Sequence, residues 1–264
     1  LYTFTLGGSA DEVTPALIKG DLDMACVPAN LAAVLYGKTD GAVEVLAVNT
    51  LGVLYILEKG DSIQSMADLR GKTIYATGKG STPEYALRYL LTENGIDPDK
   101  DVTIDWKSEH SECVAALASG QASVALLPQP FVTVAQSKIE GLRMALDLNA
   151  EWDALDNGSA LITGVIVARR EVVEANPAAV EAFLKDYAAS VDWVNANTAD
   201  AAALIGEYSI VDAAVAEKAL PYCNIVCLTG ADLLEALPGY LEVLYNASPA
   251  AVGGEMPDNS FYFA

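Results

Sequence analysis

The chain has 264 residues, of which 52% are apolar and 19% charged, so it can form one large or two medium globular domains and is not disordered. Its 15 basic and 36 acidic side chains give a net charge of −21, which argues against nucleic acid and anionic lipid surfaces as partners. No apolar run reaches the roughly 20 residues that a membrane-spanning helix needs.

The first sixty residues alternate strand patterns with helix patterns. We expect strands over residues 1–6, 21–27 and 43–57. The turn Gly7-Gly8-Ser9 leads into the first expected helix, which has Ser9 as its N-cap and ends at Gly20. A second short helix is expected over residues 31–36, after the turn Pro28-Ala29-Asn30.

The same alternation continues through the middle of the chain and gives way to helices. Strands are expected over residues 72–76, 102–106, 123–127, 142–148 and 160–168. Helices are expected over residues 65–69, 84–94, 112–118, 131–137, 177–195, 199–208, 212–220 and 231–246. Strands and helices that alternate at these lengths indicate an α/β fold with mainly parallel sheets.

Two parts of the chain repeat at a spacing of one hundred residues. The matching residues are Ala16, Leu17, Gly20, Ala25 and Pro28 with Ala116, Leu117, Gly120, Ala125 and Pro128. The copies are too long for solenoid repeats, and they predict two related α/β lobes, with chance similarity as the alternative. A strand, a Gly-rich turn and a helix precede only the second copy, so we expect the first strand and helix of lobe one, about thirty residues, to be missing.

A Gly-rich turn over residues 77–83 follows a predicted strand and precedes a predicted helix. There, unpaired N–H groups and the positive end of the helix dipole bind carboxylate, sulfonate or phosphate without a net positive charge. The candidate ligand contacts in this turn are Lys79, Gly80, Ser81 and Thr82. The turn lacks the Walker A spacing, and the alternative is an ordinary helix start with Ser81 or Thr82 as N-cap.

Further candidate ligand contacts lie where predicted strands end or cross between the lobes. Ligands of open α/β sheets bind beyond the carboxyl ends of the strands. The candidates are Gly8, Ser9, Pro28, Asn30, Asn49, Thr50, Gln129 and Thr163. The alternative for each of them is a structural role as a cap, a turn residue or a hydrogen-bonding group at a hinge.

The sequence carries no motif for catalysis or for metal binding. It has neither G-x-S-x-G nor H-E-x-x-H, and its single histidine, His110, precedes a predicted helix, which favours a capping or surface role. Cys26 and Cys113 lie in apolar stretches and are expected to be buried thiols, while Cys223 and Cys227 are expected to be thiols or a local disulfide. We therefore expect no catalytic residue, no metal and no cofactor.

Four motifs carry a family resemblance: residues 17–23 (LIKGDLD) with Pro28, 68–74 (DLRGKTI), 80–83 (GSTP) and 117–128. In these motifs the chain resembles the substrate-binding proteins of ABC importers. The branch that it resembles serves nitrate, sulfonate, taurine and bicarbonate, with relatives that bind thiamine-pyrimidine precursors. The resemblance covers residues 1–185, and in the family the turn at Gly80-Ser81-Thr82 corresponds to a ligand-contact loop.

The resemblance implies the type II periplasmic-binding-protein fold. In that fold two lobes, each a mainly parallel sheet with flanking helices, are joined by two crossing strands and close over a small solute. Carried onto this chain, lobe one comprises residues 1–53 and 166–264, and lobe two comprises residues 54–165.

The function implied by the resemblance is extracytoplasmic solute binding without enzyme activity. The expected partners are a small anionic or heteroaromatic solute and the membrane permease of an ABC importer. We expect a monomer, either in the periplasm or lipid-anchored at the cell surface. The alternative is an enzyme on the same fold, like a thiamine-pyrimidine synthase or a menaquinone-pathway lyase.

Overall fold

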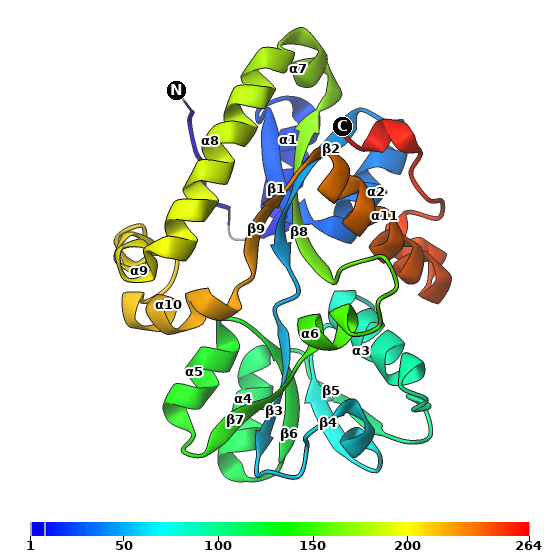
Figure 1. The fold of residues 1–264 in the computed structure, drawn as a ribbon, viewed down its shortest axis with the longest axis vertical. Coiled ribbons are helices and arrows are strands. Elements are labelled where there is room, and N and C mark those ends of the chain that lie inside the picture. Colours follow the sequence, from blue (N-terminus) through cyan, green and yellow to red (C-terminus); the bar gives the residue numbers. More distant parts are fainter. Residues whose placement is uncertain (1, 8, 264) are drawn as a thin grey trace. The chain divides into compact units, whose positions relative to one another are not determined.

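The computed structural model of the chain describes residues 2–7 and 9–263 (Figure 1). The chain divides into two compact units. The first unit comprises Leu1–Asn49, Ile162–Ala189 and Val226–Ala264, and the second comprises Thr50–Leu161 and Ser190–Ile225. Each unit contains one sheet with helices around it, so the predicted α/β class is confirmed.

The first unit is built on a four-stranded sheet in the order β1-β8-β2-β9. Its strands are β1 (Met24–Pro28), β8 (Ile162–Arg169), β2 (Val43–Leu51) and β9 (Ile225–Leu228). Its helices are α1 (Ala10–Lys19), α2 (Ala29–Lys38), α7 (Arg170–Ala175), α11 (Gly230–Ala247) and the first part of α8 (Pro177–Ala196). Helix α8 lies on one side of the strands, and α2 and α11 lie on the other (Figure 1).

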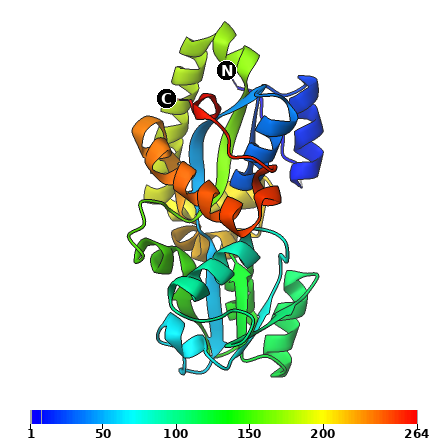
Figure 2. The same ribbon diagram turned by 90° about the vertical axis from the view of Figure 1, so that its right-hand side faces the viewer.

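The C-terminal segment of the first unit packs against α2, as Figure 2 shows from the side. It forms the 3-10 turns η3 (Pro249–Val252) and η4 (Asn259–Phe261). The Tyr36 hydroxyl donates a hydrogen bond of 2.7 Å to Asp258, and the Tyr36 ring packs against the buried ring of Phe261. The C-terminal segment is therefore an ordered strap over the first unit.

The second unit is built on a five-stranded sheet in the order β5-β4-β6-β3-β7. Its strands are β5 (Thr103–Trp106), β4 (Thr73–Ala76), β6 (Val124–Pro128), β3 (Leu54–Lys59) and β7 (Leu142–Asp147). Its helices are α3 (Thr82–Glu93), α4 (His110–Ser119), α5 (Phe131–Lys138), α6 (Leu148–Asp153), α9 (Thr198–Glu207) and α10 (Ala213–Ala219), with the 3-10 turns η1 (Met66–Leu69) and η2 (Leu220–Tyr222). Helices α3 and α6 pack together, as do α4 and α5.

The elements recur at the spacing of the sequence repeat. Helix α1 corresponds to α4, β1 to β6, α2 to α5 and β2 to β7, and the sheet order β1-β8-β2 matches the order β6-β3-β7. Both first helices end at a left-handed glycine, Gly20 with φ 87° and Gly120 with φ 77°. Two residues after this glycine, a backbone N–H donates to the corresponding carbonyl of the helix in each copy. Leu22 donates to Ala16, and Ala122 donates to Ala116. The duplicated sequence thus folds twice into the same succession of elements.

The second sheet is mainly parallel, as predicted: β5, β4, β6 and β7 run in one direction and β3 runs against them. Strand β4 is parallel to β5 and β6, but β3 is antiparallel to β6 and β7, and β8 is antiparallel to β1. Only Gly52 and Val53 separate β2 from β3. In β-α-β units, the helical crossover makes successive strands parallel. Strand β3 enters its sheet directly after β2, without such a crossover, so it can run antiparallel to its neighbours.

Residues 2–6 form no strand, so the strand predicted over residues 1–6 is wrong. The side chains of Phe4 and Leu6 are 79% and 69% exposed. Tyr2 packs its ring on Phe183 of α8 and donates its hydroxyl hydrogen to Asp186. Tyr2 thus packs on a helix while Phe4 and Leu6 face solvent, so the alternating apolar pattern does not mark a buried face here.

The segment Ser190–Ile225 belongs to the second unit, whereas the sequence placed it in lobe one. Helices α9 and α10 pack against each other, and α10 contacts α5. A small apolar cluster holds this segment together; its buried members are Ala201, Ala202, Ala216 and Leu220. Helical periodicity marks the apolar faces of these helices but does not say which sheet they cover, so the sequence could not assign them. The other two boundaries fall a few residues before the predicted ones.

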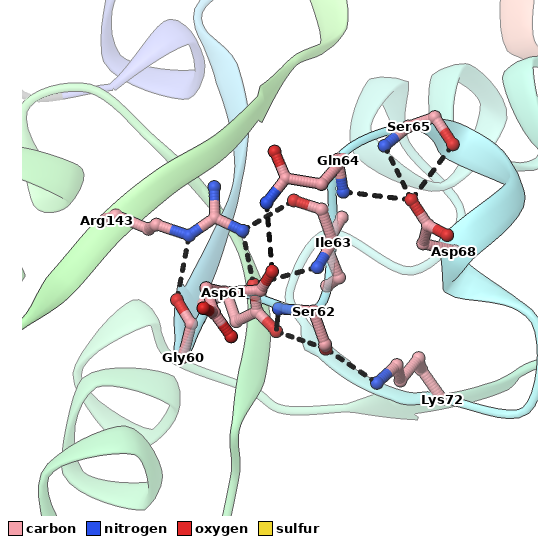
Figure 3. A network of polar contacts seen from close by, with 10 residues as sticks. Gly60, Asp61, Ser62, Ile63, Gln64, Ser65, Asp68, Lys72 and Arg143 are labelled. Carbon is pink, nitrogen blue, oxygen red and sulfur yellow. Dashed lines mark hydrogen bonds and ion pairs between the residues drawn. The ribbon is translucent and has the colours of Figure 1, made fainter.

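A buried carboxylate organises the end of β3 in the second unit (Figure 3). Glu58 accepts hydrogen bonds from the Ser62 backbone N–H at 3.0 Å, from the Ile63 backbone N–H at 3.1 Å and from Arg143 Nη2 at 2.6 Å. The Ser62 hydroxyl also donates to Glu58. Arg143 further donates to the Gly60 and Ile63 carbonyls.

The family motif over residues 68–74 supports the same loop. Asp68 accepts from the backbone N–H groups of Gln64 and Ser65 at 2.9 Å, and Lys72 donates to the Ser62 hydroxyl at 2.8 Å. With Ser65, Asp68 forms a capping box at the start of η1 (Figure 3). The acidic and basic residues of this motif therefore hold the loop after β3 in place.

Candidate functional site

Parallel strands β4 and β6 bring their carboxyl ends to one edge of the second sheet, with Tyr75 paired to Ala125. Thr77 follows β4 and Gln129 follows β6. Helices α4 and α5 begin at this edge, with His110 and Phe131 as their first residues. We call Thr77, His110, Gln129 and Phe131 the second-unit site, because open α/β sheets bind ligands at this edge.

His110 links Thr77 to Phe131 within the second-unit site. Its Nδ1 lies 2.7 Å from the hydroxyl oxygen of Thr77, and its ring lies 4.4 Å from the Phe131 ring at a tilt of 42°. Burial lowers the pKa of His110, and the nearby charge of Glu109 opposes that shift. The imidazole is therefore neutral at physiological pH, with one nitrogen as donor and the other as acceptor. The sequence favoured a capping or surface role for His110 and did not predict its contact with Thr77.

Gln129 presents an unused hydrogen-bond donor. Its side-chain Oε1 accepts from the Thr133 hydroxyl at 2.9 Å and from the Thr133 backbone N–H at 3.3 Å. A backbone N–H can only donate, so the oxygen must face Thr133 and the amide nitrogen must point away from it. Gln129 is 8% exposed, and in the part of the chain that the structure describes its Nε2 is the buried side-chain polar atom without a partner.

The start of α3, predicted to bind an anion, already holds a carboxylate of the chain. The Gly80 backbone N–H donates to Glu84 Oε2 at 2.7 Å. Ser81 is the N-cap residue, and its hydroxyl donates to the Gly78 carbonyl at 2.7 Å. Thr82 opens the helix, while Lys79 is exposed. The four predicted residues thus lie together, but the chain itself uses the Gly80 donor.

In the first unit, the predicted residues at element ends have structural contacts. Ser9 precedes α1 and is exposed, and Gly8 lies outside the described residues. Pro28 ends β1 opposite Gly164. Asn30 donates from Nδ2 to the Ala251 carbonyl at 3.3 Å, which ties α2 to the C-terminal strap. These contacts support the structural alternative for Asn30.

Asn49 lies buried in β2 and forms hydrogen bonds with Cys26 of β1 and Tyr187 of α8. Burial raises the pKa of the Cys26 thiol, and the hydrogen bond with Asn49 opposes the rise. Burial likewise raises the pKa of Tyr187 to about 12. Cys26 is nevertheless exposed as a residue, since β1 stands at the sheet edge, so the prediction of a buried residue is wrong for Cys26 and right for Cys113.

Two predicted contacts, Thr50 and Thr163, lie in strands, while Cys223 follows η2 and Cys227 lies in β9. Thr50 and Thr163 are half-buried on β2 and β8. Cys223 and Cys227 are free thiols, not the local disulfide that was one of the two expectations.

The second-unit site includes one of the predicted contacts, Gln129, by its position directly after β6. Thr77, His110 and Phe131 were not among the predicted contacts, and the structure joins these three side chains to one another. Thr77 stood inside the Gly-rich turn, directly after a strand, and this position was the signal that could have found it. Phe131 follows the Gln129-Pro130 turn at the start of an expected helix. Ligand contact by any of these residues stays a prediction.

Comparison with known proteins places the chain in a family. Residues 3–204 match the family described as ABC transporter, phosphonate, periplasmic substrate-binding protein. The chain belongs to this family. The resemblance drawn from the sequence motifs is thereby confirmed.

Relatives and solved structures agree with this family. A Brucella abortus protein named as a candidate binding protein is 27% identical over 199 residues, which are 75% of this chain and 59% of that protein. The chain thus spans about three fifths of the length of that relative. An ABC transporter structure from Parabacteroides distasonis is 25% identical, with a TM-score of 0.83 over 98% of this chain and 87% of the other.

The periplasmic aliphatic sulphonate binding protein of Escherichia coli shares the fold at 17% identity. Its TM-score is 0.75 over 97% of this chain and 80% of that protein. Across residues 2–7 and 9–263, no helix combines the length and the apolar character needed to cross a membrane.

Proposed function

We propose that the protein is the solute-binding component of an ABC importer, which binds a small solute and delivers it to a membrane permease without catalysing a reaction. The observation that carries the proposal is the family match over residues 3–204. Named relatives and the fold similarity over almost the whole chain support it. We further propose that the protein acts outside the cytoplasm as a monomer, soluble or lipid-anchored.

The second-unit site is the proposed place of solute contact in the second unit. It lies at the carboxyl edge of the sheet and offers a neutral imidazole, an aromatic ring and an amide donor without a partner. That the two lobes close over the solute stays a prediction.

Isothermal titration calorimetry and thermal shift on the full-length protein test the proposal. The probes are methylphosphonate, ethanesulfonate, nitrate, bicarbonate, nicotinamide and uracil. We expect saturable binding of at least one probe, together with a rise in melting temperature, because a ligand that binds only the folded state stabilises it. If none of these probes binds, the proposal is wrong.

One contact favours the alternative of an enzyme on the same fold. The Thr77 hydroxyl lies 2.7 Å from an imidazole nitrogen of His110, a distance at which a general base can take a proton from a nucleophile. The variant His110→Gln separates the two functions. A receptor loses affinity at most, whereas an enzyme loses turnover of a bound probe while the probe still binds.

A further inference from the structure

We propose that the second-unit site selects an uncharged, planar group that carries a hydrogen-bond acceptor, and that Glu84 excludes oxyanions from the neighbouring start of α3. This inference rests on the proposed solute-binding function and names the chemical class of its solute. It departs from the family description, which names phosphonate.

The unused amide donor calls for an acceptor on the ligand. A buried N–H without a partner costs free energy, and that cost is relieved when a ligand oxygen or nitrogen accepts from it. Two hydrogen bonds from Thr133 fix the amide of Gln129, so it cannot turn its oxygen toward the ligand. The site therefore offers a donor at this point, held in place before any ligand arrives.

The two rings of the site favour a planar group. Phe131 is 37% exposed, so part of its side-chain surface is open to solvent, and its ring lies 4.4 Å from the His110 ring. Aromatic faces bind flat groups through offset stacking or edge contacts. Thr77 holds the His110 ring through Nδ1, so its orientation is fixed as well.

Two lysines lie near Thr77, Lys79 in the sequence and Lys107 after the neighbouring strand β5. Lys107, whose backbone N–H donates to the Ala76 carbonyl next to Thr77, pairs its ammonium group with Asp105 at 3.0 Å. Lys79 is exposed at the turn before α3. A phosphonate or sulfonate group needs a positive charge or free backbone donors, and here the ammonium group of Lys107 is already paired and the Gly80 N–H already donates to Glu84.

Glu84 removes the remaining anion-binding feature of the second unit. Its carboxylate accepts from the Gly80 N–H at 2.7 Å and places a negative charge at the start of its own helix. That charge stabilises the positive end of the α3 dipole and repels a second anion. An oxyanion would have to displace Glu84 before it could use the Gly80 donor.

The first arm of the test titrates the full-length protein with nicotinamide and uracil, which are planar, neutral and bear carbonyl acceptors. We expect saturable binding that Gln129→Glu weakens by about tenfold or more, since a carboxylate cannot donate. Gln121→Glu is the control, because Gln121 is exposed and the charge change is the same.

A second variant guards against misfolding of Gln129→Glu. Phe131→Leu removes the exposed ring at a helix start and should weaken binding by about threefold to tenfold. Phe4→Leu makes the same change at a phenylalanine of the first unit that is 79% exposed, and it should leave binding unchanged.

The second arm titrates methylphosphonate and ethanesulfonate. We expect no saturable binding by the wild-type protein and measurable binding by Glu84→Ala, which frees the Gly80 N–H and removes the repelling charge. Glu93→Ala, at the other end of α3, is the control with the same loss of charge and should gain nothing.

The outcomes separate this inference from the proposed function. Wild-type binding of an anion that Glu84→Ala leaves unchanged overturns the inference and keeps the solute-binding function. Planar probes that fail to bind, or that bind independently of Gln129 and Phe131, overturn it too. An absence of binding by every probe in both arms, and by nitrate and bicarbonate as well, defeats both proposals.

Discussion

The buried carboxylate of Glu58 makes the stability of the second unit depend on one hydrogen-bond network (Figure 3). We predict that Glu58→Gln destabilises the protein strongly. Glu58 is 3% exposed and accepts four hydrogen bonds from Ser62, Ile63 and Arg143. A glutamine can keep its oxygen toward Ser62, but its NH₂ group would then face the Ile63 N–H and the Arg143 guanidinium, which are both donors.

The expected cost follows from the burial of the pair. Removing one partner of a buried ion pair costs about 3–5 kcal/mol. The Arg143 side chain is 32% exposed, so water recovers part of its lost interaction, and we expect about 3 kcal/mol. Asp99→Asn is the matched control: Asp99 pairs with Arg88 at 2.7 Å but is 69% exposed, and its loss should cost less than about 1 kcal/mol.

Urea unfolding followed by circular dichroism measures both variants against the wild type, and hydrogen exchange at Ser62 and Ile63 localises the loss. Burial by itself would raise the pKa of Glu58, but the hydrogen bonds from Ser62, Ile63 and Arg143 lower it overall. Its stabilisation is therefore complete above the ordinary glutamate pKa of about 4.3 and is lost as pH falls through the lower folded value. A cost of Glu58→Gln no larger than that of Asp99→Asn would refute this reasoning.

Three further predictions concern stability. Gly52→Ala should cost about 1–3 kcal/mol in urea unfolding, because a Cβ there would lie 2.6 Å from Leu161 Cδ2; an unchanged midpoint would contradict this. Gly37→Ala should instead stabilise α2 by about 0.5–1 kcal/mol in the same assay, since a Cβ there meets nothing within 4 Å. Burial raises the pKa of Glu44 despite the Arg170 charge, so its carboxylate opposes folding increasingly as pH rises from the unfolded pKa to the folded one. The variant Glu44→Gln should therefore have a higher melting temperature than the wild type at neutral pH and the same melting temperature at acid pH. A melting temperature that rises only at acid pH would contradict this prediction.

The sequence predicted most elements because their boundaries carry local signals. Gly20 and Gly120 end their helices in the left-handed conformation that glycine favours. The strand predicted over residues 1–6 is wrong because the alternating apolar side chains of Phe4 and Leu6 are exposed and do not form a buried face. Tyr2 packs its ring on Phe183 of α8 instead.

The site was less predictable than the fold because its contacts join distant residues. Gln129 followed from the rule that ligands bind beyond strand ends. The role of His110 depends on Thr77, which lies 33 positions earlier, and neither residue signals the other in the sequence. At the start of α3, the sequence predicted the backbone donors but not that the chain occupies one of them. The first turn of the helix brings the Glu84 carboxylate close to Gly80, and it accepts from the Gly80 N–H.

Comparison of the two copies of the repeat distinguishes the backbone frame of the second-unit site, meaning its helix and strand ends, from the side chains that it carries. At the spacing of one hundred residues, His110 corresponds to Ala10 and Gln129 to Ala29. Both copies keep the glycine-ended helix and the proline-ended strand that fix where these positions lie. The backbone frame therefore tolerates alanine at both positions, so the imidazole and the amide are not required to form it. The unpaired amide donor of Gln129 and the alanine at the matching position of the other copy support the proposal that Gln129 contacts a solute.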